Sequence, residues 1–260
     1  MRAFSVVVRR SPTQKQVIQK QNIIENGVGV KRFMAKVYTK MGLGVAATMG
    51  TALTLAPFDF GLGAFGVGAV GMFGSIYAFS KYSPTHHTKM VEDETVYYTK
   101  NPKAREYAYW SLAGSMGIMM SPVVGIYMTV DPFVIPAGIM ISSYVFGGCA
   151  LYSYRTTNTA ISTWKAPLMI GLTGLVGMQF IGLGASLLFG ANSFSSFIHS
   201  VDTFGGIGLF TLMSIYDAYI AKQMYIKGDA DHLSCALTVY LDFMNLLIRI
   251  MDALAKSRKN

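Results

Sequence analysis

Seven apolar segments dominate the chain and limit what it can fold into. Each approaches the roughly 20 residues that a helix needs to cross the hydrocarbon core of a bilayer. They lie at 41–57, 60–80, 108–129, 133–153, 167–189, 204–222 and 235–253. We therefore expect an all-α polytopic membrane protein, with seven transmembrane helices in a domain over residues 41–255 that is surrounded by the lipid bilayer.

The composition favours the same fold class. Of the 260 residues, 52% are hydrophobic and 13% are charged, whereas about a quarter of an average soluble domain is charged. The two cysteines, Cys149 and Cys235, lie in or beside apolar segments. We interpret them as small hydrophobic residues rather than as a disulfide or a metal site.

Basic residues are concentrated in the N-terminal arm, residues 1–40. The arm holds nine Lys and Arg against one acid, Glu25, within a chain whose net charge is +9. A basic segment with no acid before Glu25 is typical of a mitochondrial transit peptide. The alternative is a cytoplasmic tail placed by the positive-inside rule. Aromatic stacking groups do not accompany the bases, so we expect no nucleic acid partner.

The remaining charges predict the orientation of the chain. If the spans alternate, 18 of the 22 bases lie on the N-terminal side of the membrane and only four, all near the C-terminus, lie on the other. Three of those four belong to a short basic tail, residues 256–260. The positive-inside rule then places the N-terminus in the matrix for a mitochondrial inner membrane, or in the cytoplasm for the endoplasmic reticulum or another internal membrane.

Several shorter motifs have simple explanations. The string GLGAFG, 61–66, matches a dinucleotide fingerprint but lies within a predicted span. His86 and His87 precede three acids, and we interpret 81–107 as a solvated polar loop rather than a metal site. Small residues at Gly42-Ala46-Gly50 permit close helix contact, and the short link PFDF predicts a tight hairpin of the first two spans. Without a nucleophile beside a base, a phosphate loop or CxxC, we expect no enzyme.

Two acids lie well inside apolar segments, Asp217 in the sixth and Asp242 in the seventh. A charged group at the centre of a bilayer costs roughly 2.5–3.5 kcal/mol on insertion scales, so such residues tend to be functional. In an antiparallel hairpin both would lie roughly 8–10 Å from the turn side and adjacent to each other. Such a pair would share a proton or bind a cation such as Ca²⁺. The alternative is that it only pins the two helices together by hydrogen bonds.

Two further polar residues share the helical face of Asp242. Asn245, three residues on, offers an amide oxygen to the same site. Arg249, seven residues on, lies about 10 Å away along the helix axis. For Arg249 we therefore expect a side chain that extends to the far membrane interface, rather than one that pairs with an aspartate.

The last two spans carry the clearest similarity to known proteins. Their segments ALTVYLDFMNLLIRI and LFTLMSIYD resemble the transmembrane Bax inhibitor motif family, which includes Bax inhibitor-1 and a bacterial calcium-leak protein. A looser similarity covers 108–189 through SPVVGIY and KAPLMIGLTGLVG. The segment KAPLMIGL, the Arg after DFMNLLI and the basic N-terminal extension are similar to the mitochondrial branch of that family.

The resemblance implies a fold of seven helices, with six arranged around a central seventh. It also implies that Asp217 and Asp242 form a pH-sensing calcium site, with no other cofactor. Two features depart from the family pattern. Ala218-Tyr219 replaces the usual Thr-Gln after the sixth-span aspartate, and the second span has no base before Lys81.

Two functions remain open. The first is a proton-sensitive Ca²⁺ leak or Ca²⁺/H⁺ exchange through the aspartate pair in the mitochondrial inner membrane. The second is a structural role without transport, as an accessory subunit of a large inner-membrane assembly such as a respiratory complex or a cristae scaffold. The retained aspartates favour the first, and the two departures favour the second.

Overall fold

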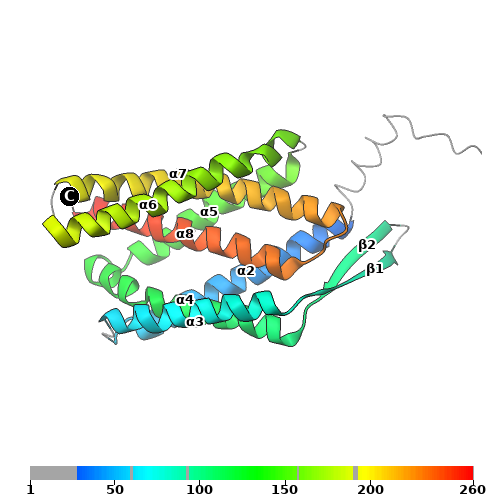
Figure 1. Ribbon diagram of the computed structural model, residues 1–260, viewed down its shortest axis with the longest axis horizontal. Helices are drawn as coiled ribbons and strands as arrows, with labels where there is room; N and C mark the ends of the chain where they lie inside the picture. The colour runs from blue at the N-terminus through cyan, green and yellow to red at the C-terminus, as the bar shows by residue number, and fades with distance from the viewer. Residues whose placement is uncertain (1–27, 59–60, 92–93, 157, 190–192, 260) are drawn as a thin grey trace, which may run out of the picture.

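The computed structural model describes residues 28–58, 61–91, 94–156, 158–189 and 193–259. Most of the N-terminal arm, 1–27, therefore lies outside the described residues. The described chain forms long helices that run back and forth along one common direction (Figure 1). These helices are α2 (Val28–Leu55), α3 (Gly61–Lys81), α4 (Lys103–Val130), α5 (Val134–Arg155), α6 (Lys165–Phe189), α7 (Ser193–Ile226) and α8 (His232–Lys259). A short 3₁₀ helix, η1 (Thr159–Trp164), precedes α6.

Six stretches of the described helices are long and apolar enough to cross a membrane, and they include α3, α4, α5, α7 and α8 nearly whole. The sixth stretch runs from η1 into α6, Thr159–Gly182. This confirms an all-α membrane protein. Helix α2, which contains the first predicted span, is not among the six. Its first half carries four bases, and the uncharged part that follows, 41–55, is shorter than the usual span.

Helix α8 forms the centre of the packing. It contacts α2, α4, α5 and α7, and two thirds of its apolar window is buried, the largest share among the six candidate spans. Helix α3 packs mainly on α4, and α6 packs mainly on α7. On the α2 side of α8, the Tyr240 hydroxyl lies 2.6 Å from the Thr48 hydroxyl, which also bonds the carbonyl oxygen of Ala113 in α4.

The first two helices do not form the tight hairpin that the short PFDF link predicts. Both α2 and α3 pack closely on α4 rather than on each other. Glycines on α3 explain this choice: a Cβ at Gly68 would approach the backbone of α4 at Ser115, and a Cβ at Gly71 would overlap the Ser115 hydroxyl. By contrast, Gly42 and Gly50 of the predicted small-residue motif have no atoms near a built Cβ.

Residues 81–107, predicted to be a loop, contain a β-hairpin. Strands β1 (Thr85–Val91) and β2 (Glu94–Lys100) pair antiparallel, with Thr85 opposite Lys100. The hairpin extends beyond the helices at one end of the molecule (Figure 1). Tyr97 anchors it, since its backbone N–H donates to the Tyr225 hydroxyl and the two rings meet edge to face. The run of β-branched and aromatic residues in TVYYT was the available signal for a strand.

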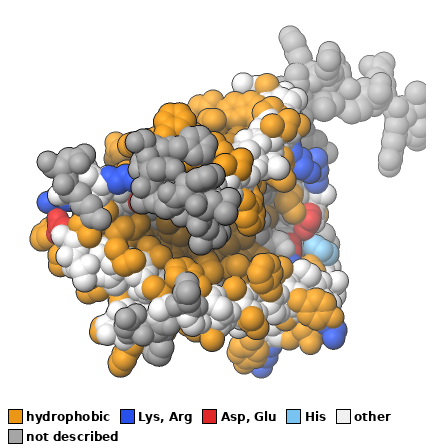
Figure 2. Space-filling view, turned by 60° about the vertical axis from the view of Figure 1, so that its left-hand side comes forward, with side chains coloured by type: hydrophobic (Ala, Val, Ile, Leu, Met, Phe, Trp, Pro, Cys, Tyr) orange, Lys and Arg blue, Asp and Glu red, His pale blue; other side chains and the backbone are white. Residues whose placement is uncertain are grey.

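The outer surface of the helices is strongly apolar. Large side chains such as Val70, Met140, Tyr144 and Ile170 are more than 70% exposed. Figure 2 shows hydrophobic side chains over most of the visible face, with charged side chains in small separate places. Such a surface would aggregate in water, so these side chains face the hydrocarbon of a lipid bilayer.

Candidate functional site

The two aspartates lie opposite each other on neighbouring antiparallel helices. Asp217 is nine residues before the end of α7, and Asp242 is ten residues after the start of α8. At 1.5 Å per residue both lie about 14–15 Å from the helix ends. This is deeper than the 8–10 Å that the sequence predicts, because α7 continues to Ile226 and α8 begins at His232, beyond the apolar segments.

The structure brings the two carboxyl groups together. The side chains of Asp217 and Asp242 lie within interaction distance of each other. Two carboxyl groups this close can hydrogen-bond to each other only if one of them carries a proton, because a carboxylate can only accept. The Asp242 side chain is buried, and its Oδ2 atom has no hydrogen-bond partner among the described residues.

Helical spacing explains why α8 can present an aspartate to α7 and still pack against α2. Tyr240 and Met244 are fully buried against the other side of the bundle, and Phe243 contacts the Phe146 ring on α5. Asp242 lies between them in sequence but about 200° from Tyr240 around the helix. Tyr240 and Asp242 therefore face different helices, α2 and α7.

The two supporting residues are placed differently. Asn245 is half-buried, and its amide nitrogen donates to the carbonyl oxygen of Leu241 within α8. Its position one turn after Asp242 keeps it on the same helical face. Because its amide nitrogen is used within α8, its amide oxygen is the atom that can act as a ligand beside the aspartate pair.

The prediction for Arg249 is wrong. Its side chain extends away from Asp242, but it does not reach the membrane interface. The guanidinium is buried and lies 2.9 Å from Oδ1 of Asp202 on α7, with its central carbon 4.9 Å from the centre of the Phe210 ring. Gly206 makes this path possible, because a Cβ there would overlap Arg249. A charge that finds a partner inside the protein has no reason to extend to water.

Asp202 is the main residue that the sequence analysis missed. It lies two residues before the predicted sixth span and so resembled a loop residue, but α7 begins earlier, at Ser193. Gln179 of α6 also donates to its carboxylate. A further acid, Asp252 of α8, accepts from Thr203 and pairs with Lys256 and His199 at the same end of the bundle. The spacing of Asp252 and Lys256, i and i+4, was a visible signal.

The opposite end of the bundle holds a second buried ion pair. Arg105, at the start of α4, lies 2.7 Å from Asp231, which directly precedes α8, and it also donates to Ser234. Both side chains are less than 10% exposed. Burial raises the pKa of Asp231, but the hydrogen bonds from Arg105 and Ser234 outweigh it and hold the pKa below its usual range.

The histidines of the β-hairpin do not gather a metal site among the described residues. His86 lies 3.7 Å from Asp229 and contacts Thr99. Glu92 and Asp93 lie outside the described residues, and no group of three or more metal-binding side chains occurs in the part that the structure describes. If the aspartate pair binds a cation, its two carboxylates supply too few ligands, and water must supply the others.

Two departures from the family pattern can also be placed. Ala218 and Tyr219 are both buried within the bundle. Lys81, in the last turn of α3, is the only base of that helix. The nearest basic residue that follows Asp242 on α8, Arg249, pairs with Asp202 instead of with the aspartate pair.

Comparison with known proteins identifies the family of the chain. A family model described as inhibitor of apoptosis-promoting Bax1 matches residues 30–259, which include every helix that contributes to the pair. An uncharacterized protein of Rickettsia prowazekii is 27% identical over 88% of this chain and 92% of its own length. An uncharacterized protein of Caulobacter vibrioides is 22% identical over 89% of this chain and 91% of its own.

A named relative is similar over a shorter region. The growth hormone-inducible transmembrane protein of Rattus norvegicus is 25% identical over 62% of this chain, and the match spans 46% of that relative. The family model covers far more than half of the chain. This chain therefore belongs to the Bax inhibitor family of integral membrane proteins.

Proposed function

We propose that this protein is a proton-sensitive Ca²⁺ pathway, either a leak or a Ca²⁺/H⁺ exchanger, with Asp217 and Asp242 as ion site and proton sensor. The observation that carries the proposal is the close approach of these two carboxyl groups, nine and ten residues inside the adjoining ends of α7 and α8. Acids at that depth are costly, so they tend to mark ion or proton pathways. We propose no enzymatic activity.

The chemistry of the pair supports a two-state site. With one shared proton, the two carboxyl groups hold each other and the path between α7 and α8 is closed. Loss of that proton leaves two negative groups in contact, which repel each other and attract a divalent cation. Ca²⁺ takes 6–8 oxygen ligands. Water and the amide oxygen of Asn245 would supply those that the carboxylates do not.

Arg249 has a second role in this proposal. Its guanidinium lies between the aspartate pair and the C-terminal end of α8, held by Asp202. A fixed positive charge on that path opposes the passage of a cation. We propose that the Arg249–Asp202 ion pair keeps this end of the pathway closed in the protonated state.

Ca²⁺ uptake into proteoliposomes tests the ion site. Wild-type protein is expected to admit more Ca²⁺ as the pH rises, because the pair loses its proton. Asp217→Asn and Asp242→Asn keep the shape of the hydrogen bond but remove a charge, so each should abolish this pH dependence while the protein still folds. Asp131→Asn is the matched control, since Asp131 pairs with Arg258 in a loop away from the pair. Unchanged pH dependence in both site variants would reject the site.

The alternative is a structural accessory subunit of a large inner-membrane assembly, without transport. The burial of Ala218 and Tyr219 and the lack of a base in α3 before Lys81 favour it. This function predicts no Ca²⁺ flux in the wild type. It also predicts that Asp242→Leu loses assembly while Asp242→Asn largely keeps it, which native electrophoresis in mild detergent measures.

We propose that the protein lies in the mitochondrial inner membrane with its N-terminus in the matrix. The acid-poor basic arm supports this location. The Rickettsia and Caulobacter relatives are bacterial, so membranes elsewhere, including the endoplasmic reticulum, are the alternative. We further propose that α2 also crosses the bilayer, which gives seven spans with six arranged around α8.

A further inference from the structure

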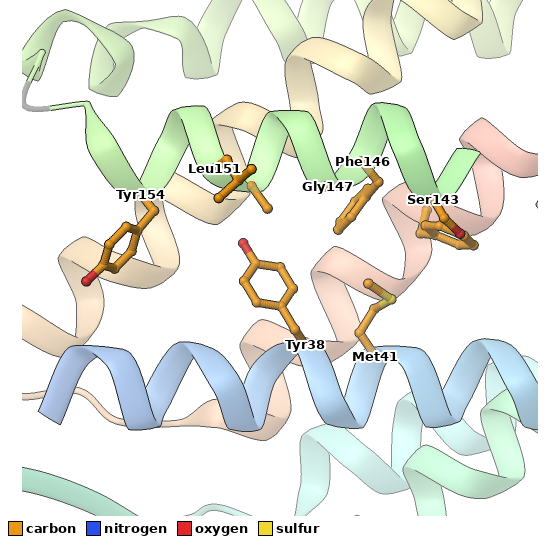
Figure 3. A pocket seen from close by; sticks show the side chains of 9 residues that line it. Tyr38, Met41, Ser143, Phe146, Gly147, Leu151 and Tyr154 are labelled. Atoms are coloured by element: carbon orange, nitrogen blue, oxygen red, sulfur yellow. The ribbon is translucent and has the colours of Figure 1, made fainter. Parts of the chain in front are cut away.

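A groove between α2 and α5 is separate from the aspartate pair. Two adjoining cavities of about 440 and 320 Å³ lie along it and share Met41, Ser143 and Phe243 as lining residues. Figure 3 shows α2 and α5 on opposite sides of the first cavity, with side chains from both helices directed into it. Along α5 the lining extends from Ile139 to Tyr154, about 22 Å.

Small residues keep the groove open. Gly42 on α2 and Gly147 on α5 both line it, and a Cβ built at either would meet no atom within 4 Å. The lining is otherwise almost entirely apolar. A groove of this length exceeds half of the roughly 30 Å hydrocarbon core, so it can hold one extended acyl chain.

Two hydroxyl groups distinguish this groove from an ordinary lipid-facing surface. The hydroxyls of Tyr38 and Tyr154 are buried and have no hydrogen-bond partner within the described part of the chain. Both side chains project into the space between the two helices (Figure 3). A buried hydroxyl without a partner costs stability, and two at one end of a groove point to an occupant that carries oxygen atoms at that depth.

The same end of the groove is basic. Arg155 follows Tyr154 directly and is exposed, and Lys31, also exposed, precedes Tyr38 by two helical turns on the groove-facing side of α2. Lys31 lies about 10 Å beyond Tyr38 along α2, and Arg155 is the last residue of α5, next to Tyr154. That order, with charge outermost, hydroxyls next and an apolar groove inside, matches an anionic headgroup, its ester oxygens and its acyl chain.

We propose that the α2–α5 groove binds an anionic phospholipid, with one acyl chain in the groove, ester oxygens at the Tyr38 and Tyr154 hydroxyls, and the headgroup at Lys31 and Arg155. The probe is a phosphatidylglycerol with a diazirine in its acyl chain, used as a minor component of phosphatidylcholine vesicles that contain the full chain. Photo-crosslinking should label groove residues of α2 and α5, and unlabelled phosphatidylglycerol should compete better than phosphatidylcholine.

Matched glycine variants test the groove itself. Gly147→Leu fills it and should abolish the labelling, whereas Gly148→Leu, at the adjacent exposed position with equally free space, should leave it unchanged. Tyr38→Phe and Tyr154→Phe each remove one hydroxyl and should weaken competition by phosphatidylglycerol about fivefold. Equal labelling of the two glycine variants, unaltered competition in both tyrosine variants, or equal competition by the two lipids would overturn the proposal.

Discussion

One buried ion pair links two helices at the end of the bundle where α4 and α8 begin. Arg105 and Asp231 join the start of α4 to the start of α8, and both are buried. Removing one partner of a buried ion pair leaves the other charge uncompensated, which is strongly destabilising. The pair should therefore matter far more to stability than the ion pairs on the surface.

Asp231→Asn is expected to lower the free energy of unfolding by on the order of 3 kcal/mol at neutral pH, because Arg105 loses its counter-charge. The pKa of Asp231 is lowered in the folded state from 3.8, so its contribution is fully present above pH 4 and is lost as the pH falls through the lower folded value. Tryptophan fluorescence during thermal unfolding in detergent measures both effects.

The exposed pair Asp131–Arg258 supplies the control for that prediction. Its arginine is more than half exposed, so Asp131→Asn should change stability by less than about 1 kcal/mol. A difference between wild type and Asp231→Asn that grows as the pH falls below 4 would contradict the assignment.

The sequence made some of these residues visible and hid others. Asp217 and Asp242 were found because a charge in the middle of an apolar segment is rare. Asp202 and Asp231 were missed because they lie just outside the predicted spans, among residues that resembled loops. Only the extension of α7 to Ser193 and the packing of α4 beside α8 bury them.

At the scale of elements, the contact between α7 and α8 has two polar levels. The aspartate pair lies toward the end where α7 finishes and α8 begins, and Arg249 with Asp202 lies toward the opposite end, near the C-terminus of α8. Gly206 lets the arginine side chain pass along α7 between these levels. The two helices are thus joined by an acid pair and by an ion pair.

A double-mutant cycle tests the second level. Arg249→Met should destabilise the protein because Asp202 remains charged in a partly buried place, and Asp202→Asn in the same chain should restore part of the loss. The expected coupling is on the order of 1–3 kcal/mol, measured by thermal unfolding in detergent. Gly206→Ala should mimic Arg249→Met by displacing the arginine. Strictly additive effects would show that the two side chains act independently.

Helices were easier to predict than their partners. Six of the seven apolar segments correspond to helices that can cross a membrane, because length and hydropathy are local properties. The helix that packs on α3 cannot be read from local sequence. The short link favoured α2, but the glycine face of α3 packs on α4. The β-hairpin was missed because no apolar period marks a polar two-stranded ribbon.

At the scale of the whole molecule, positive charge is concentrated at one end of the helix bundle. The β-hairpin, the start of α2 and the loops after α5 and α7 lie at one end, and the C-terminus lies at the other (Figure 1). Most Lys and Arg residues belong to the first end. Under the positive-inside rule that end faces the matrix if the proposed location is right.

Cysteine labelling tests this orientation. In a background without Cys149 and Cys235, Ser83→Cys precedes the β-hairpin and Phe133→Cys lies in the loop between α4 and α5; both positions are exposed. A membrane-impermeant thiol reagent added to mitoplasts from cells that express the protein should modify position 133 and spare position 83 until detergent is added. Modification of 83 alone would invert the topology. Recovery of neither variant with mitochondria would place the protein in another membrane, where the same two cysteines still report which end carries the basic loops.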